Sequence, residues 1–62
     1  MRQDAKNLLA AKGESPIKDA IVKSIRDFKR LGDSKSEVLE TLTDIFGDYF
    51  THFIKSQISQ LM

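Results

Sequence analysis

Asp44, Asp48 and His52 are the residues whose types and spacing come closest to a chemical site. They recur every four positions, so on a helix their side chains lie along one stripe. Imidazole and carboxylate groups at this spacing can bind zinc or exchange a proton. One helix cannot surround a tetrahedral ion, however, and the chain has no second histidine and no cysteine. We therefore interpret the stripe as a solvated acidic surface, and we expect no catalytic residue, no metal site and no cofactor.

The basic residues offer a second kind of chemistry, because lysine and arginine side chains bind phosphate or carboxylate groups. The net charge is only +1, but residues 1–32 hold eight Lys/Arg and four Asp/Glu, whereas residues 33–62 hold two and five. The basic residues are candidate contacts with nucleic acid or an acidic partner, or else an ordinary solvated face. The candidates are Lys18, Lys23, Arg26, Lys29, Arg30 and Lys35.

The elements that position these residues are predicted to be helices separated by glycine. A short helix is expected over residues 4–12 and a longer one over residues 16–31. Ser15 is the expected N-cap of the longer helix, Pro16 its first residue, and Gly32 its end. In this helix the apolar residues recur at a helical period on one side, with the basic residues on the other.

The third predicted helix spans residues 35–61. Ser34 and Glu37 form a capping-box pattern at its start. Gly47 lies inside it, and a break there is the alternative, because glycine within a helix costs about 1 kcal/mol relative to alanine. The apolar pattern continues in phase through the glycine, so the segment is predicted to be one helix about 40 Å long. The predicted fold is therefore all-α: a short N-terminal helix and an antiparallel pair with a long C-terminal helix, assembled as a dimeric helical bundle.

This long helix has two apolar faces about 100° apart. The first is expected to pack within the chain and consists of Val38, Leu42, Ile45, Phe46, Tyr49 and Phe53. Nothing remaining in the chain except the short first helix could cover the second face, so self-association is predicted, with a dimer favoured. The expected oligomer interface is Gly47, Phe50, Ile54, Gln57, Ile58 and Leu61, part of which follows the spacing of a coiled-coil seam.

Composition places the chain among small folded proteins. Charged residues make up 31% and hydrophobic residues 40% of its 62 residues, as in ordinary globular domains. One domain over residues 1–62 is expected, and a chain this short commonly needs disulfides, a metal or a second copy for stability. No segment has the apolar run of a signal peptide or a membrane span, so the expected location is the cytoplasm, without membrane contact.

One segment resembles a known family. Leu31-Gly32-Asp33-Ser34-Lys35-Ser36-Glu37-Val38-Leu39 is similar to the helix–turn–helix junction of ribbon-helix-helix repressors, over about a seventh of the chain. The resemblance implies a small dimeric DNA-binding regulator of phage, plasmid or bacterial type. That family reads the major groove with a paired N-terminal strand, whereas residues 7–13 here are rich in leucine and alanine and are predicted to be helical.

The predicted function is that of a small non-catalytic helical oligomer that binds another protein as an adaptor, inhibitor or regulatory subunit. An enzyme is not expected, because 62 residues offer no pocket-forming loops and no nucleophile–base pair. A DNA-binding transcriptional regulator is the alternative. The polar face of the third helix carries Glu37, Glu40, Asp44 and Asp48. These carboxylates would repel phosphates, so a protein partner is favoured over nucleic acid.

Overall fold

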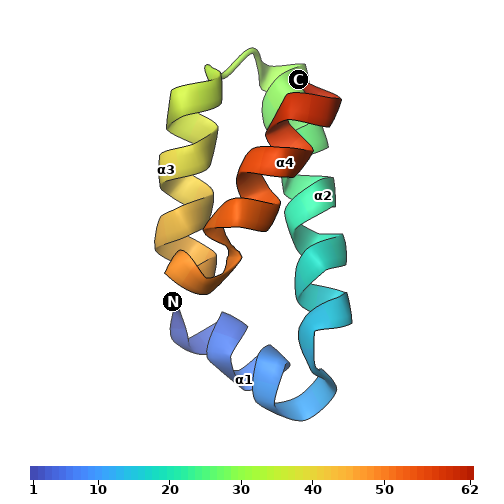
Figure 1. Cartoon of the computed structure of the whole chain (residues 1–62), viewed down its shortest axis with the longest axis vertical. Coiled ribbons are helices and arrows are strands. Elements are labelled where there is room, and N and C mark those ends of the chain that lie inside the picture. The colour runs from blue at the N-terminus through green and yellow to red at the C-terminus, as the bar shows by residue number, and fades with distance from the viewer.

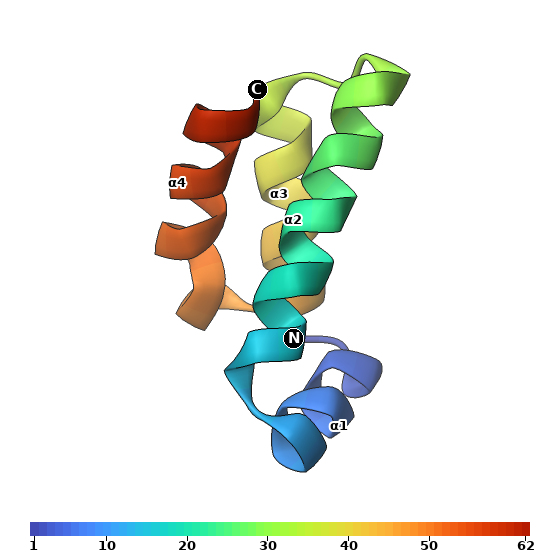
Figure 2. The same ribbon diagram turned by 90° about the vertical axis from the view of Figure 1, so that its right-hand side faces the viewer.

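A computed structural model describes all 62 residues of the chain. Its elements are α1 (Gln3–Lys12), α2 (Glu14–Leu31), α3 (Lys35–Phe46), a 3-10 turn η1 (Asp48–Phe50) and α4 (Thr51–Leu61). Figure 1 shows α2, α3 and α4 along the long axis of the molecule, with α1 across its lower end. The view turned by 90° shows the same three-helix bundle with α1 beneath it (Figure 2). The predicted all-α fold class and the short N-terminal helix are confirmed.

The start of α2 differs from the predicted one. The helix begins at Glu14, so Ser15 lies inside the first turn and no side chain caps the helix. Gly13 precedes it with a φ of 81°, and its N–H donates to the carbonyl of Leu9 at 2.9 Å to end α1. Glycine accepts a positive φ without a steric penalty, so this one residue turns the chain from α1 into α2. Pro16 still lies in the first turn, where its missing N–H costs no helical hydrogen bond.

The turn between α2 and α3 confirms the predicted helix end and cap. Gly32 is left-handed, with φ 83° and ψ 18°, and the N–H groups of Gly32 and Asp33 donate back into the last turn of α2. This is the Schellman arrangement, which satisfies carbonyls that a helix end leaves free. Ser34 then caps α3, because its hydroxyl oxygen accepts the N–H of Glu37 at 3.2 Å.

The predicted single helix over residues 35–61 is wrong, because the chain reverses at Gly47. This residue has φ 85° and ψ 168°, a combination open essentially only to glycine. Its N–H donates to the carbonyl of Thr43 at 2.8 Å and closes α3. After η1, α4 runs back along the bundle (Figure 1). A continuous helix of about 40 Å would exceed the 32 Å long axis of the molecule.

The reversal is favourable because it buries the apolar residues that follow Gly47. Phe50, Ile54 and Ile58 are only 2%, 0% and 6% exposed. Burying three such side chains contributes about 5–9 kcal/mol, at about 1.5–3 kcal/mol each. Interrupting a helix forgoes up to about four backbone hydrogen bonds, each worth about 1 kcal/mol. Burial therefore outweighs the helical hydrogen bonds that are lost.

One apolar cluster holds the four helices together. Its buried members are Ala5, Ile17, Ile21, Ile25, Val38, Leu42, Phe46, Phe50, Ile54 and Ile58. The N-terminal segment closes the end of the bundle where α3 gives way to η1. There the N–H of Arg2 donates to the carbonyl of Ile45 at 2.8 Å, and the Arg2 guanidinium lies 3.6 Å from the Asp44 carboxylate.

Tyr49, predicted to pack within the chain, lies outside the core, as does Leu31. Leu31 and Tyr49 are each 75% exposed. Leu31 is the last residue of α2, where the chain leaves the bundle, and Tyr49 lies in η1, where the reversal turns it outward. Of the other residues on the face predicted to pack within the chain, Ile45 and Phe53 are half-buried. The remaining three, Val38, Leu42 and Phe46, are buried. No helix combines the length and the apolar content needed to cross a membrane.

Candidate interaction surfaces

The predicted oligomer interface is not a free apolar surface. Its residues are Gly47, Phe50, Ile54, Gln57, Ile58 and Leu61. Phe50, Ile54 and Ile58 belong to the core of the single chain, Gly47 is the turn residue, and the other two are half-buried along α4. The prediction assumed a continuous helix, whereas α4 folds back and covers these side chains within one molecule. Self-association stays a prediction, but this face no longer supports it.

The predicted stripe of Asp44, Asp48 and His52 is broken by the same reversal. Asp44 lies in α3, Asp48 in η1 and His52 in α4, so the three no longer follow one helix. All three are exposed, and no three His, Cys, Asp or Glu side chains are grouped to hold a metal ion. The acidic surface that remains on α3 consists of Glu37, Glu40 and Asp44, all exposed.

Five of the six basic residues predicted as partner contacts lie together on the outer side of α2. They are Lys18, Lys23, Arg26, Lys29 and Arg30, all exposed, and we call them the α2 basic face. At 3.6 residues per turn they span an arc of about 140°. The face makes one ion pair, between Arg30 and Asp27, whose charged atoms are 4.0 Å apart one turn along the helix. Lys35, the sixth predicted contact, lies on α3 and is not part of this face.

Other side chains give the α2 basic face a mixed character. Exposed Asp19 and half-buried Val22 fall within the same arc. At one border Lys18 Nζ lies 5.4 Å from the ring centroid of Phe53 on α4, a distance at which a cation and an aromatic face attract each other. The face therefore presents ammonium and guanidinium groups around a small apolar centre, with one carboxylate among them.

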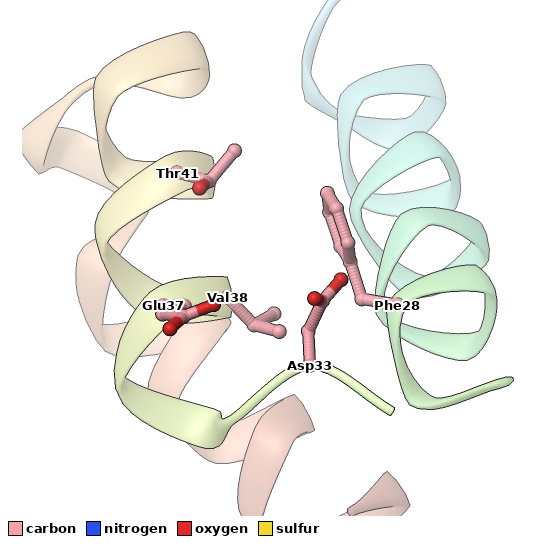
Figure 3. Close-up of a pocket in the computed structure, with 5 residues that line it drawn as sticks. All are labelled: Phe28, Asp33, Glu37, Val38 and Thr41. Atoms are coloured by element: carbon pink, nitrogen blue, oxygen red, sulfur yellow. The ribbon is translucent and has the colours of Figure 1, made fainter. Parts of the chain in front are cut away.

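A small pocket lies between α2 and the start of α3 (Figure 3). Phe28 and Val38 supply its apolar wall, and Asp33, Glu37 and Thr41 supply oxygen atoms. In Figure 3 the Asp33 carboxylate points into the gap between the two helices, beside the Phe28 ring. The volume of about 110 Å³ lies below the range of about 300–1,000 Å³ found for small-molecule sites. The pocket has room for a few waters, at about 30 Å³ each, and we assign it no substrate.

A larger, open groove follows the contact between α3 and α4. It has a volume of about 340 Å³ and is lined by Lys35, Ser36, Leu39, Lys55, Ile58 and Ser59. Neither lysine forms an ion pair. The sequence prediction missed this groove, because its two walls come together only through the reversal at Gly47. The rotation of the apolar face after Gly47 was the signal that could have revealed the groove.

No family model, curated protein or solved structure matches the chain. We therefore infer function from the surfaces that the bundle presents. The α2 basic face and the acidic residues of α3 are suited to contacts with charged partners, and the α3–α4 groove is large enough for a small molecule.

Tyr49 in η1 feels the charge of Glu14, the first residue of α2. The nearby Glu14 carboxylate raises the pKa of Tyr49 above its usual value of 10.0, first through hydrogen bonding to the protonated hydroxyl and then through its negative charge. The Tyr49 ring also packs edge-on against Phe50, with 5.0 Å between ring centroids.

We expect Glu14→Gln to lower the pKa of Tyr49 toward its usual value, because an amide replaces the carboxylate charge. Ultraviolet absorbance reports this ionisation directly, since the chain has one tyrosine and no tryptophan. The pKa is higher in the folded than in the unfolded chain, so the contact stabilises the fold below about pH 10. That stabilisation is lost as the pH rises through the folded-state pKa. Asp19→Asn is the control, and a wild-type titration curve for Glu14→Gln would contradict the contact.

Proposed function

We propose that the protein is a non-catalytic helical module that binds another protein through the α2 basic face. The observation that supports this is the separation of charge. Five exposed cations lie on one side of α2 with a single local ion pair, while Glu37, Glu40 and Asp44 lie on α3. Like charges on one helix face repel each other, and a partner of opposite charge removes that repulsion. Complementary charge also steers association and selects the partner.

Two residues within the α2 basic face favour protein over nucleic acid as the partner. The Asp19 carboxylate would repel a phosphate backbone. Val22 offers an apolar contact of the kind found at the centre of protein interfaces. The partner that fits is an acidic, partly apolar protein surface, and the module would act on it as an adaptor, inhibitor or regulatory subunit.

A second copy of the chain is one candidate for this partner. The acidic residues of α3 could face the α2 basic face of another molecule, which would give a homo-oligomer through surfaces other than the predicted apolar seam. Such contacts between exposed charges are each worth only about 0–1 kcal/mol, so this association would be weak and sensitive to salt. Sedimentation equilibrium at low and high salt measures it, and a monomer under both conditions would exclude this partner.

DNA binding is the alternative function, and the same five cations favour it. If all five contacted phosphates, affinity for random duplex DNA would fall about 500-fold between about 50 and 200 mM salt. Fluorescence anisotropy of a labelled duplex measures this dependence. The protein-binding proposal predicts that duplex DNA does not bind with this steep dependence on salt.

The double reversal Arg26→Glu/Lys29→Glu tests the proposed function. Both positions flank Val22 on the α2 basic face, and we expect the double variant to lose at least about tenfold in affinity for the partner, through lost attraction and new repulsion. Lys6→Glu/Lys12→Glu in α1 is a control with the same change in net charge. Cross-linking in extract of the native host should capture the same protein with wild type and control, but not with the α2 variant.

Two results would contradict the proposed function. One is equal capture by the α2 variant and the wild type. The other is steeply salt-dependent binding of duplex DNA that Arg26→Glu/Lys29→Glu abolishes, which would establish the alternative instead. Circular dichroism of both double variants confirms that each keeps its helices, as expected for exposed positions.

A further inference from the structure

The groove between α3 and α4 gathers positive charge without a counter-ion. Lys35 borders it from the first turn of α3 and Lys55 from the middle of α4, and no carboxylate lines it. The whole of α4 contains no aspartate or glutamate. Two ammonium groups bordering one groove repel each other, so an anion between them would be stabilised by both.

The same groove has an apolar lining, of which Leu39 supplies most of the exposed part and Ile58 very little. Leu39 of α3 is half-buried and Ile58 of α4 is 6% exposed, and both line the groove. The hydroxyls of Ser36 and Ser59 lie on opposite walls and can donate hydrogen bonds. An inorganic ion would leave the exposed part of Leu39 uncovered, whereas a ligand with an apolar chain would cover it and gain from its burial.

We propose that this groove binds a small carboxylate that carries a short alkyl chain. Its carboxylate lies between Lys35 and Lys55, and its alkyl chain packs on Leu39 and Ile58. Binding of this kind combines charge-assisted hydrogen bonds with burial of apolar surface. The groove shares no residue with the α2 basic face, so the inference is independent of the proposed function.

Size and charge separate this groove from the pocket between α2 and α3. A volume of about 340 Å³ falls within the range of about 300–1,000 Å³ typical of small-molecule sites, whereas the other pocket has about 110 Å³. The smaller pocket is also lined by Asp33 and Glu37, which would repel a carboxylate. Only the α3–α4 groove therefore fits an anionic ligand.

A titration followed by amide chemical shifts tests the proposal with three probes. Octanoate has both the charge and the chain, octanol has the chain alone, and acetate has the charge alone. We expect octanoate to cause saturable shifts centred on Ser36, Leu39, Lys55 and Ser59. Octanol and acetate should each bind at least about tenfold more weakly.

Neutral variants test whether the two groove lysines attract the carboxylate of the ligand. Lys35→Gln and Lys55→Gln should each weaken octanoate binding by about fivefold, while Lys12→Gln in α1 should bind like the wild type. All three lysines are exposed, so the variants keep the fold. Wild-type affinity in both groove variants would overturn the proposal. Equal binding of octanol and octanoate, or shifts centred on another surface, would overturn it as well.

Discussion

Ile54→Ala is expected to lower the free energy of unfolding by about 2–5 kcal/mol. Ile54 is 0% exposed and lies in the core that α4 shares with the rest of the bundle, so the truncation leaves a cavity as well as losing buried apolar surface. A chain of 62 residues has a total stability of only about 3–9 kcal/mol. The expected loss is therefore a large part of the total stability, as urea denaturation followed by circular dichroism would measure.

The same experiment distinguishes a core within one chain from an interface between chains. Because Ile54 is buried inside a single molecule, its stability loss should not depend on protein concentration. Ser56→Ala, at an exposed position of the same helix, should change stability by no more than about 0.5 kcal/mol. A stability loss for Ile54→Ala that shrinks as concentration rises would place this residue at an interface instead.

Gly47→Ala is expected to destabilise the protein by about 1–3 kcal/mol through backbone strain alone. Gly47 has φ 85° and ψ 168°, which an alanine rarely adopts. The added Cβ would also lie 3.2 Å from the Cβ of Met1, closer than ordinary contact, so the N-terminal segment would have to shift. Urea denaturation again gives the size of the effect.

The sign of the Gly47→Ala effect separates the two folds that the sequence allows. In a continuous helix the same substitution would stabilise by about 1 kcal/mol, because alanine is the better helix former. Gly32→Ala is a matched control: Gly32 also has a positive φ, of 83°, but no atom lies within 4 Å of its added Cβ. We expect it to cost about 1–2 kcal/mol. A gain in stability for Gly47→Ala would contradict the reversal.

The features that could be predicted from sequence are those decided by local chemistry. Gly32 ends α2 and Ser34 caps α3 as predicted, because the left-handed glycine and the serine hydroxyl act on backbone groups within a few residues. The one-sided pattern of α2 was equally informative, since a single stripe of isoleucines faces the core and leaves the lysines and arginines outside. The α2 basic face could therefore be predicted before the fold was known.

The reversal at Gly47 could not be predicted from local chemistry alone. Glycine inside a helix costs only about 1 kcal/mol. Long-range packing contributes more than this, and it can favour either a continuous helix or a break. The rotation of the apolar face after Gly47 was visible in the sequence, but it is compatible both with a second chain covering the face and with α4 folding back. Burial of Phe50, Ile54 and Ile58 within one core decides between them.

The same long-range packing explains why the candidate sites were not correctly predicted from the sequence. Lys55 and Ser59 have no partners along their own helix, and only the return of α4 brings them opposite Lys35 and Ser36. Conversely, Asp44 and His52 follow helical spacing in the sequence but are separated by the turn between α3 and α4. Spacing along the chain is a guide to proximity only while the helix continues.

The distance between residues 36 and 59 tests the reversal at Gly47 most directly. The chain has no cysteine, so Ser36→Cys/Ser59→Cys takes two nitroxide labels selectively, and dilution with unlabelled protein removes contacts between molecules. Both positions line the groove between α3 and α4, and neighbouring helix axes lie about 8–10 Å apart, so we predict strong dipolar broadening that survives dilution. On a continuous helix the two residues would be about 35 Å apart, and a separation of that size would contradict the fold described.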